Sequence, residues 1–187
     1  VTGQARDIYL EYQGKATEEE ILSMYENKTA RYSIEGPLHL GWLLAGGDEE
    51  VLKLYSEFAI PVGIAYQIQD DILGVFGDEQ AIGKPVGSDI AEGKYTLLVA
   101  KAMELGTGSQ KDELRRILGI GEGITGQDIE VFRNLLTETG ALDVCIKQAK
   151  EATEKGLSIL PELKEHLTQE AFHFLSALSE YLLERKS

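Results

Sequence analysis

Residues 66–78 read YQIQDDILGVFGD and close the longest apolar helical pattern in the chain. The pattern begins after Asp48, which we expect to be its N-cap, and continues to about Phe76. Two adjacent carboxylates, Asp70 and Asp71, lie inside this pattern. Aspartate is a poor helix-interior residue, and neighbouring carboxylates repel each other unless a cation is near. Such a pair in a pocket wall would make a site for a hard cation such as Mg²⁺, whereas an isolated pair in an acidic helix is more often solvated surface. The segment that follows the pair distinguishes these two interpretations.

Helical spacing recurs along most of the chain, whereas the alternation typical of strands is nearly absent. The fold class expected is therefore all-α, a helical bundle around a shared core. Thr17 is expected to cap a helix over 18–31, Gly36-Pro37 to interrupt the pattern, and Pro61 to kink the long helix. Further helices are expected over 38–45, 94–105, 109–118, 127–139, 141–159 and 168–184, with a turn at 160–167.

Residues 77–93 are rich in glycine and lack a helical period, which predicts a functional loop. Glycines let the backbone approach a ligand closely, and Lys84 and Lys94 could bind phosphate oxygens. Lys94 is expected to open the next helix, where a lysine is unfavourable unless an anion is bound. Gln67 precedes Asp70 and Asp71 by one helical turn and shares their face. Carboxylates followed by these lysines indicate a site for Mg²⁺ and a diphosphate.

Composition excludes several other kinds of protein. The formal net charge of the 187 residues is -14, which argues against a nucleic-acid partner and against adsorption to an anionic membrane. No apolar run is long enough for a transmembrane helix. The only cysteine is Cys145, and the three histidines are scattered, so neither a disulfide nor a zinc site is expected. A cytoplasmic location is the natural expectation.

Residues 66–78, followed by GKPVGSDIAEGKYT at 83–96, resemble the second aspartate-rich motif and downstream lysines of trans-isoprenyl diphosphate synthases, which include farnesyl and geranylgeranyl diphosphate synthases. Two upstream segments add to this resemblance. NKTARY at 27–32 resembles the family's Lys-Thr helix motif, and GQARD at 3–7 resembles its GQxxD segment. The motifs cover about 1–105, and the remainder agrees in helical character.

The resemblance implies the isoprenoid-synthase helical bundle around a central substrate cavity, and a Mg²⁺-dependent prenyltransferase of isoprenoid biosynthesis. Such an enzyme condenses an allylic diphosphate with isopentenyl diphosphate, and a homodimer is expected. The implied metal ligands are Asp70 and Asp71, and the implied diphosphate ligands are Lys28, Lys84 and Lys94. The reacting end of the cavity would be lined by Gln4, Asp7, Tyr32 and Gln67. The implied catalytic residues are Lys28, Thr29, Gln67, Asp70 and Lys84.

Two departures from the family pattern qualify this interpretation. Gly74 stands where the second motif often has another aspartate, so metal binding would rest on Asp70, Asp71 and Asp78. The first aspartate-rich motif and the GKxxR segment that binds isopentenyl diphosphate are not found in the sequence. We therefore expect residues 1–187 to be a single domain, the C-terminal part of a short-chain synthase, and to be inactive alone.

Three alternatives remain at this point. One is a non-catalytic regulatory subunit of a prenyl synthase heteromer, which need not retain Asp70, Asp71, Lys84 and Lys94. Another is a terpene cyclase, although cyclases usually carry a different second metal motif. The third is an acidic helical interaction module, which leaves the lysine-bearing glycine loop unexplained.

Overall fold

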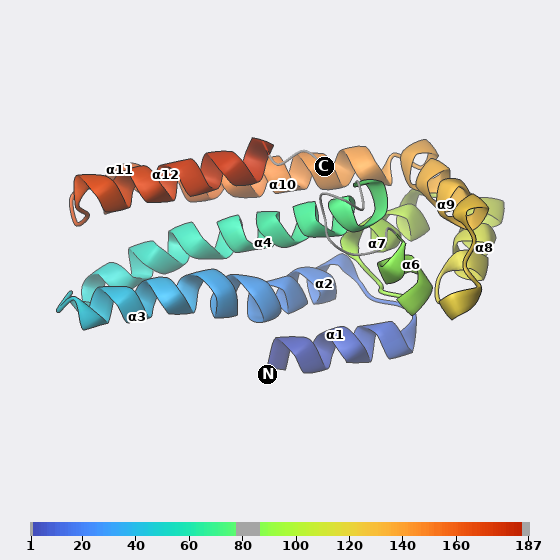
Figure 1. The fold of residues 1–187 in the computed structure, drawn as a ribbon, viewed down its shortest axis with the longest axis horizontal. Coiled ribbons are helices and arrows are strands. Elements are labelled where there is room, and N and C mark those ends of the chain that lie inside the picture. The colour runs from blue at the N-terminus through green and yellow to red at the C-terminus, as the bar shows by residue number, and fades with distance from the viewer. Residues whose placement is uncertain (1, 78–86, 185–187) are drawn as a thin grey trace.

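The computed structural model describes residues 2–77 and 87–184, and every regular element in these ranges is helical (Figure 1). The all-α prediction is therefore confirmed. In chain order the elements are α1 (Thr2–Gln13), α2 (Glu18–Tyr25), η1 (Glu26–Glu35), α3 (Gly36–Leu44), η2 (Glu49–Val51), α4 (Leu52–Phe76), α6 (Ser88–Glu92), α7 (Leu97–Leu105), α8 (Gly108–Ile117), η3 (Gly121–Gly123), α9 (Gly126–Glu138), α10 (Ala141–Leu157), α11 (Leu160–Leu163) and α12 (Gln169–Glu184).

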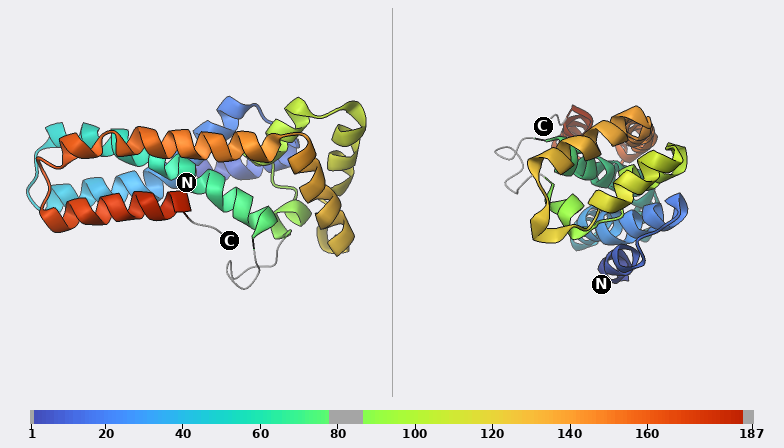
Figure 2. Two further views of the ribbon diagram at one scale, coloured as in Figure 1. Left: turned by 90° about the horizontal axis from the view of Figure 1, so that it is seen from above. Right: turned by 90° about the vertical axis from the view of Figure 1, so that its right-hand side faces the viewer.

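Helix α4 forms the centre of an elongated bundle (Figures 1 and 2). Its most extensive contacts are with α10 on one side and η1 on the other. Helices α6 to α9 close one end of the bundle, and α1 lies outside α2 and η1 (Figure 1). The larger apolar core surrounds the half of α4 that carries Asp70 and Asp71. A smaller core surrounds the first half of α4 and contains Tyr55 and Phe58.

The segment from Thr17 to Leu44 follows the prediction at its start and departs from it in the middle. The Thr17 hydroxyl accepts a hydrogen bond from the backbone N–H of Glu20, while the Glu20 side chain accepts one from the N–H of Thr17, so the predicted N-cap is confirmed. The predicted break at Gly36-Pro37 is wrong. Residues 26–35 form a π-helix that continues into α3, and the Gly36 N–H donates to the carbonyl of Arg31. Pro37 lies in the first turn of α3, where its missing N–H costs little.

The boundaries of α4 correct the sequence prediction at one end. The helix begins at Leu52 because residues 49–51 form a short 3₁₀ turn. Asp48 is the N-cap of that turn, and its side chain makes no capping hydrogen bond. Pro61 lies inside α4 without ending it, and the predicted end at Phe76 is confirmed.

The start of the helix predicted over 94–105 is also wrong. Helix α7 begins at Leu97, because Thr96 is its N-cap and accepts a hydrogen bond from the Val99 N–H. Lys94 therefore lies just before the helix, in the segment after Gly93. Part of the predicted loop is the short helix α6, and the predicted turn at 160–167 contains α11. Helix α1 was not expected, whereas α8, α9, α10 and α12 lie within two residues of their predicted ranges.

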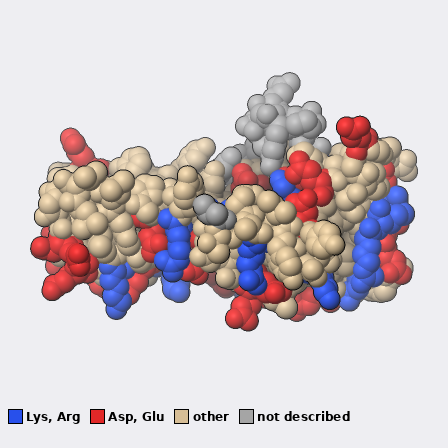
Figure 3. Space-filling view, turned by 90° about the horizontal axis from the view of Figure 1, so that it is seen from below, with Lys and Arg blue, Asp and Glu red and all other residues tan. Residues whose placement is uncertain are grey.

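None of the described helices is both long and apolar enough to span a lipid bilayer. Large apolar side chains are exposed on α1 and α3, among them Ile8, Tyr9, Tyr12 and Leu44. Figure 3, which views the molecule from the side of α1, shows broad uncharged areas between isolated basic and acidic side chains.

Helix α4 crosses η1 closely because Gly63 lies against Ala30. A Cβ atom at Gly63 would overlap the Cα and Cβ atoms of Ala30. The contact lies one turn before Gln67 on α4, and Ala30 is two residues after Lys28, so this crossing sets how near the two helices bring those side chains. By contrast, Gly108 lies in the exposed first turn of α8, where an added Cβ would have no neighbouring atom within 4 Å.

We expect Gly63→Ala to lower the free energy of unfolding by about 1–3 kcal/mol, because the added methyl group must push two helices apart. Gly108→Ala is the matched control and should change stability by less than about 0.5 kcal/mol. Urea unfolding followed by circular dichroism measures both. Equal stability of the two variants would contradict the close crossing.

Candidate active site

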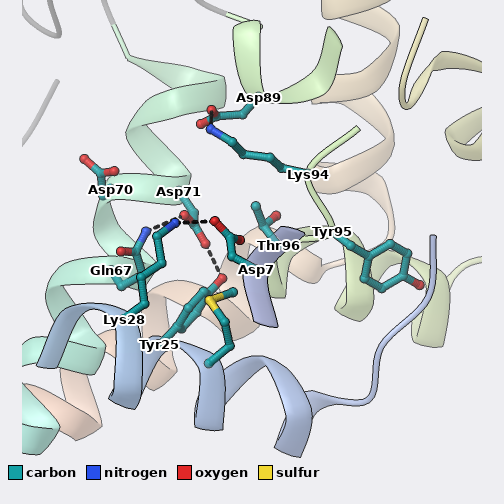
Figure 4. Close-up of a pocket in the computed structure, with 11 residues that line it drawn as sticks. Asp7, Tyr25, Lys28, Gln67, Asp70, Asp71, Asp89, Lys94, Tyr95 and Thr96 are labelled. Carbon is teal, nitrogen blue, oxygen red and sulfur yellow. Dashed lines mark hydrogen bonds and ion pairs between the residues drawn. The ribbon is translucent and has the colours of Figure 1, made fainter. Parts of the chain in front are cut away.

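A polar pocket opens between α1, α2, η1, α4 and the segment that joins α6 to α7 (Figure 4). Eleven described residues line it: Asp7, Met24, Tyr25, Lys28, Gln67, Asp70, Asp71, Asp89, Lys94, Tyr95 and Thr96. Six of these side chains were predicted to be functional from the sequence: Asp7, Lys28, Gln67, Asp70, Asp71 and Lys94. Segments separated by up to 89 positions in the sequence (Asp7 to Thr96) thus meet at one site.

Each pocket lysine is paired with an aspartate from another turn or helix. The Lys28 Nζ lies 2.5 Å from the Asp7 Oδ2, which joins η1 to α1. The Lys94 Nζ lies 2.5 Å from the Asp89 Oδ1 and 3.1 Å from the Glu92 Oε2. Burial disfavours the charged form of Lys94, but the hydrogen bond and charge of Asp89 outweigh it and raise the pKa of Lys94. Lys94 therefore remains cationic beside the pocket.

Asp71 is buried, and both of its carboxylate oxygens accept hydrogen bonds. The Tyr25 hydroxyl donates to Oδ2, and the Gln67 Nε2 donates to Oδ1 over 2.9 Å (Figure 4). The Gln67 Oε1 in turn accepts a hydrogen bond of 2.6 Å from the Thr29 Oγ1. The Leu97 N–H donates to the Tyr25 oxygen over 2.9 Å. This network, made of Tyr25, Thr29, Gln67, Asp71 and the Leu97 N–H, ties α2, η1, α4 and α7 together.

Burial raises the pKa of Asp71 to about 7, and the charges of Asp70 and Asp89 act in the same direction. The hydrogen bonds from Tyr25 and Gln67 oppose this rise because they stabilise the carboxylate. Burial, and then the Asp71 charge, raise the pKa of Tyr25 well above its usual value, so the phenol stays protonated and can donate.

Asp70 differs from its neighbour in burial and in hydrogen bonding. Its side chain is half-buried, lines the pocket, and points away from the network that holds Asp71 (Figure 4). It makes no hydrogen bond or ion pair with another residue in the described ranges 2–77 and 87–184. Asp70 is therefore the pocket carboxylate that is most available to a ligand.

The residues present fit a Mg²⁺ ion that is shared with a phosphate ligand. Within the described part of the chain, no group of three or more His, Cys, Asp or Glu side chains could hold a metal alone. Mg²⁺ does not need such a group, because it is usually bound by one or two carboxylates together with waters and substrate phosphates. Asp70 supplies such a carboxylate, and Lys28 and Lys94 supply the charges that a phosphate needs.

Other predicted residues lie outside this pocket or outside the described ranges. Gln4 is exposed on α1, and its Nε2 lies 3.5 Å from the Asp7 Oδ2. Thr29 is buried behind Gln67. Tyr32 is 76% exposed and does not line the pocket, because the π-helical turn of η1 rotates it relative to the α-helical spacing from Lys28. Lys84 and Asp78 fall outside the described residues, and their roles stay predictions.

Sequence reasoning assigned no role to Tyr25, Asp89 or Thr96, all of which line the pocket. Asp89 lies within the motif at 83–96, so its place between two lysines was a usable signal. Tyr25 carries no such signal. It is 46 positions from Asp71 and 72 from the amide of Leu97, and only the folded chain brings these groups together.

Comparisons with known proteins match the chain to one family of enzymes. The sequence model of the polyprenyl synthetase family matches residues 1–136. A short chain isoprenyl diphosphate synthase of Methanothermobacter thermautotrophicus is 36% identical over 185 residues, which are 98% of this chain and 54% of the relative. A geranylfarnesyl diphosphate synthase of Aeropyrum pernix is 34% identical over 98% of this chain and 55% of its own length.

Solved structures show the same likeness. The crystal structure of geranylgeranyl pyrophosphate synthase from Corynebacterium glutamicum, complexed with isoprenyl diphosphate and magnesium, matches with a TM-score of 0.92 and 35% identity. The match covers 99% of this chain and 52% of that one. The chain thus spans about half the length of the relatives that it matches.

The raised pKa of Asp71 predicts how stability depends on pH in Mg²⁺-free buffer. The folded chain holds this proton up to about pH 7, whereas the unfolded chain releases it near the ordinary value of 3.8. Between those values the folded state binds more protons, so the contribution to stability is lost as the pH rises through about 7. The contribution of this group should therefore lower the thermal midpoint between about pH 4 and pH 7 in the wild type, and the midpoint should fall less in Asp71→Asn.

Thermal unfolding followed by circular dichroism at several pH values measures this difference. Asp143→Asn, an exposed substitution on α10, is the control and should follow the wild type. Identical pH dependence of Asp71→Asn and the wild type would show that Asp71 does not titrate in this range.

Proposed function

The chain belongs to the polyprenyl synthetase family, and we propose that it is the C-terminal part of a short-chain prenyltransferase of the farnesyl or geranylgeranyl diphosphate synthase type. The proposed enzyme condenses an allylic diphosphate with isopentenyl diphosphate in isoprenoid biosynthesis. The observation that carries the proposal is a pocket in which an available carboxylate, Asp70, lies opposite two cationic side chains, Lys28 and Lys94.

The charge of the pocket supports a cation-dependent anion site. Four aspartates and two lysines are among the described residues that line it. Carboxylates remain in excess even when Asp71 is protonated, so a bare diphosphate would be repelled. A diphosphate can bind there only when cations accompany it. The acidic wall therefore favours a Mg²⁺-diphosphate ligand over a free anion or an uncharged molecule.

We assign different roles to the two adjacent aspartates. Asp70 is the proposed direct ligand of Mg²⁺, because it lines the pocket and has no hydrogen-bonded partner among the described residues. Asp71 is proposed to orient this part of α4 without binding the metal, because its two oxygens already accept hydrogen bonds from Tyr25 and Gln67. This assignment narrows the sequence prediction, which gave both carboxylates to the metal. When bound, Mg²⁺ supplies positive charge that stabilises the departing diphosphate.

The chain's own residues orient the diphosphate and stabilise the charge on it. Lys28 and Lys94 hold ammonium groups beside the pocket, and each can donate to a phosphate oxygen while it remains near its aspartate. As the allylic carbon–oxygen bond breaks, negative charge collects on the diphosphate, and both lysines stabilise it. The isopentenyl double bond then attacks the allylic carbon, and loss of a proton restores the double bond. Lys84 is proposed as a third diphosphate ligand, and Gln4, Asp7, Gln67 and Tyr32 as the lining of the reacting end.

The assembly and location follow the family and are proposals as well. A homodimer is supported by the large apolar side chains that are exposed on α1 and α3, because apolar side chains gathered at a surface can mark an interface. A cytoplasmic location is supported by the cysteine content, since Cys145 is a buried free thiol and no disulfide is possible.

Asp70→Asn should weaken the binding of inorganic pyrophosphate in the presence of Mg²⁺ by more than about 100-fold, because it removes the proposed metal ligand with almost no change in shape. Isothermal titration calorimetry on the protein in its full encoded length measures this affinity. Asp143→Asn serves as the control, since it removes an exposed aspartate far along the chain, on α10. Equal affinity of Asp70→Asn and the wild type would contradict the assignment.

The 187-residue chain itself should release no condensation product, because it provides only one of the two carboxylate clusters that the family motifs imply. The purified chain would be incubated with radiolabelled isopentenyl diphosphate, an allylic diphosphate and Mg²⁺, and the extracted products counted. Formation of a prenyl product would contradict the proposal that this chain is one part of the enzyme.

A further inference from the structure

We propose that Tyr25 is a positioning residue whose hydroxyl sets the spacing between the carboxylates of α4 and the lysine-bearing segment that precedes α7. The inference rests on the proposed function, because it names the residue that holds the two sides of that site in place. It assigns Tyr25 no contact with substrate or metal.

The first observation is that the Tyr25 hydroxyl bridges two different helices. The side chain, which belongs to α2, is 1% exposed, and its oxygen accepts a hydrogen bond from the Leu97 N–H. Since that amide can only donate, the single phenolic proton is left for the Asp71 carboxylate, to which the hydroxyl donates. While Asp71 is ionised, the direction of both bonds is therefore fixed, and one oxygen atom links the two helices.

The second observation is what each bond holds in place. Asp71 is adjacent to Asp70 on α4, so anchoring the Asp71 carboxylate fixes the rotation of the turn that presents Asp70. Leu97 is the first residue of α7, and the segment before it is tightly folded. The Lys94 N–H donates to the Asp89 carbonyl, and the Thr96 N–H donates to the Lys94 carbonyl. Holding Leu97 thus also holds Lys94.

Together these bonds place Tyr25 between the two groups that the proposed reaction must keep apart at a set distance. Asp70 is on the side of the cation, and Lys94 is on the side of the diphosphate. A cation shared by a carboxylate and a phosphate tolerates little change in the separation of its ligands, because Mg²⁺ demands near-ideal geometry. Replacing a residue that orients a metal ligand through hydrogen bonds usually changes the affinity of the site for the metal.

A purely structural role makes a different prediction, and Tyr55 allows the two to be separated. Tyr55 is also a buried tyrosine, 4% exposed, but it lies in the smaller core around the first half of α4. Replacing either tyrosine with phenylalanine keeps the ring and removes one hydroxyl group. Any general cost of that change should appear in both variants, whereas an effect on the Mg²⁺ requirement should appear only at Tyr25.

The test compares Tyr25→Phe and Tyr55→Phe in the protein at its full encoded length. Calorimetric titration with inorganic pyrophosphate at a series of Mg²⁺ concentrations gives the Mg²⁺ concentration for half-maximal binding. We expect Tyr25→Phe to raise that concentration by about tenfold and to lower kcat by a similar factor, while Tyr55→Phe stays within about twofold of the wild type. An unchanged Mg²⁺ requirement in Tyr25→Phe, or the same shift in both variants, would overturn the inference.

A second measurement keeps the test decisive if Tyr25→Phe is less stable. The rise in thermal midpoint caused by Mg²⁺ and pyrophosphate compares each variant with itself, so it reports binding separately from folding. The rise should be smaller in Tyr25→Phe than in Tyr55→Phe, and equal rises would overturn the inference.

If the wild type binds no pyrophosphate with Mg²⁺, the proposed function fails as well. If the wild type binds and Tyr25→Phe binds equally, only the role of Tyr25 fails.

Discussion

A carboxylate taken out of water must find hydrogen-bond donors, and this constraint at Asp71 organises the site. The donors come from α2 and α4, and their own partners come from η1 and α7. Four elements from three separate parts of the sequence are therefore held at one point by a single buried carboxyl group. The close approach of α4 and η1 at Gly63 allows this, because it brings Gln67 within reach of Thr29.

The same constraint explains why two adjacent aspartates have different chemistry. Successive residues on a helix point in directions about 100° apart, so one carboxylate can face the interior while the next faces the pocket. Asp71 is buried, and both of its carboxylate oxygens accept hydrogen bonds, so Asp70 is the carboxylate that is available to a ligand. The excess of carboxylates around the pocket would repel an anionic ligand that came without cations. The relatives that match this chain are named as diphosphate synthases.

Local sequence patterns predicted the helical class and most helix boundaries, because capping residues and apolar spacing act over a few positions. Thr17 and the end of α4 at Phe76 are examples. The predictions failed where the local sequence was compatible with more than one helix boundary or helix type. Lys94 was predicted to be the first residue of a helix, whereas the Thr96 hydroxyl caps a helix that starts three residues later, at Leu97. The π-helical bonding of η1 has no composition signal, and Tyr32 on this element is exposed.

Part of the candidate site could be predicted from the sequence, because some residue types indicate a role by their charge alone. Asp70, Lys28 and Lys94 belong to types whose charge suggests a role wherever they stand, and they do converge. Tyr25 is an ordinary core residue by type, so its role depends on partners that only the folded chain supplies.

The central claim is that Asp70 binds the metal while Asp71 keeps its hydrogen bonds to Tyr25 and Gln67. A crystal structure with Mg²⁺ and pyrophosphate tests this claim most directly. We expect an ion at about 2.0–2.1 Å from an Asp70 oxygen, with both hydrogen bonds to Asp71 intact. An ion coordinated by Asp71, with the bond to Tyr25 broken, would contradict that claim.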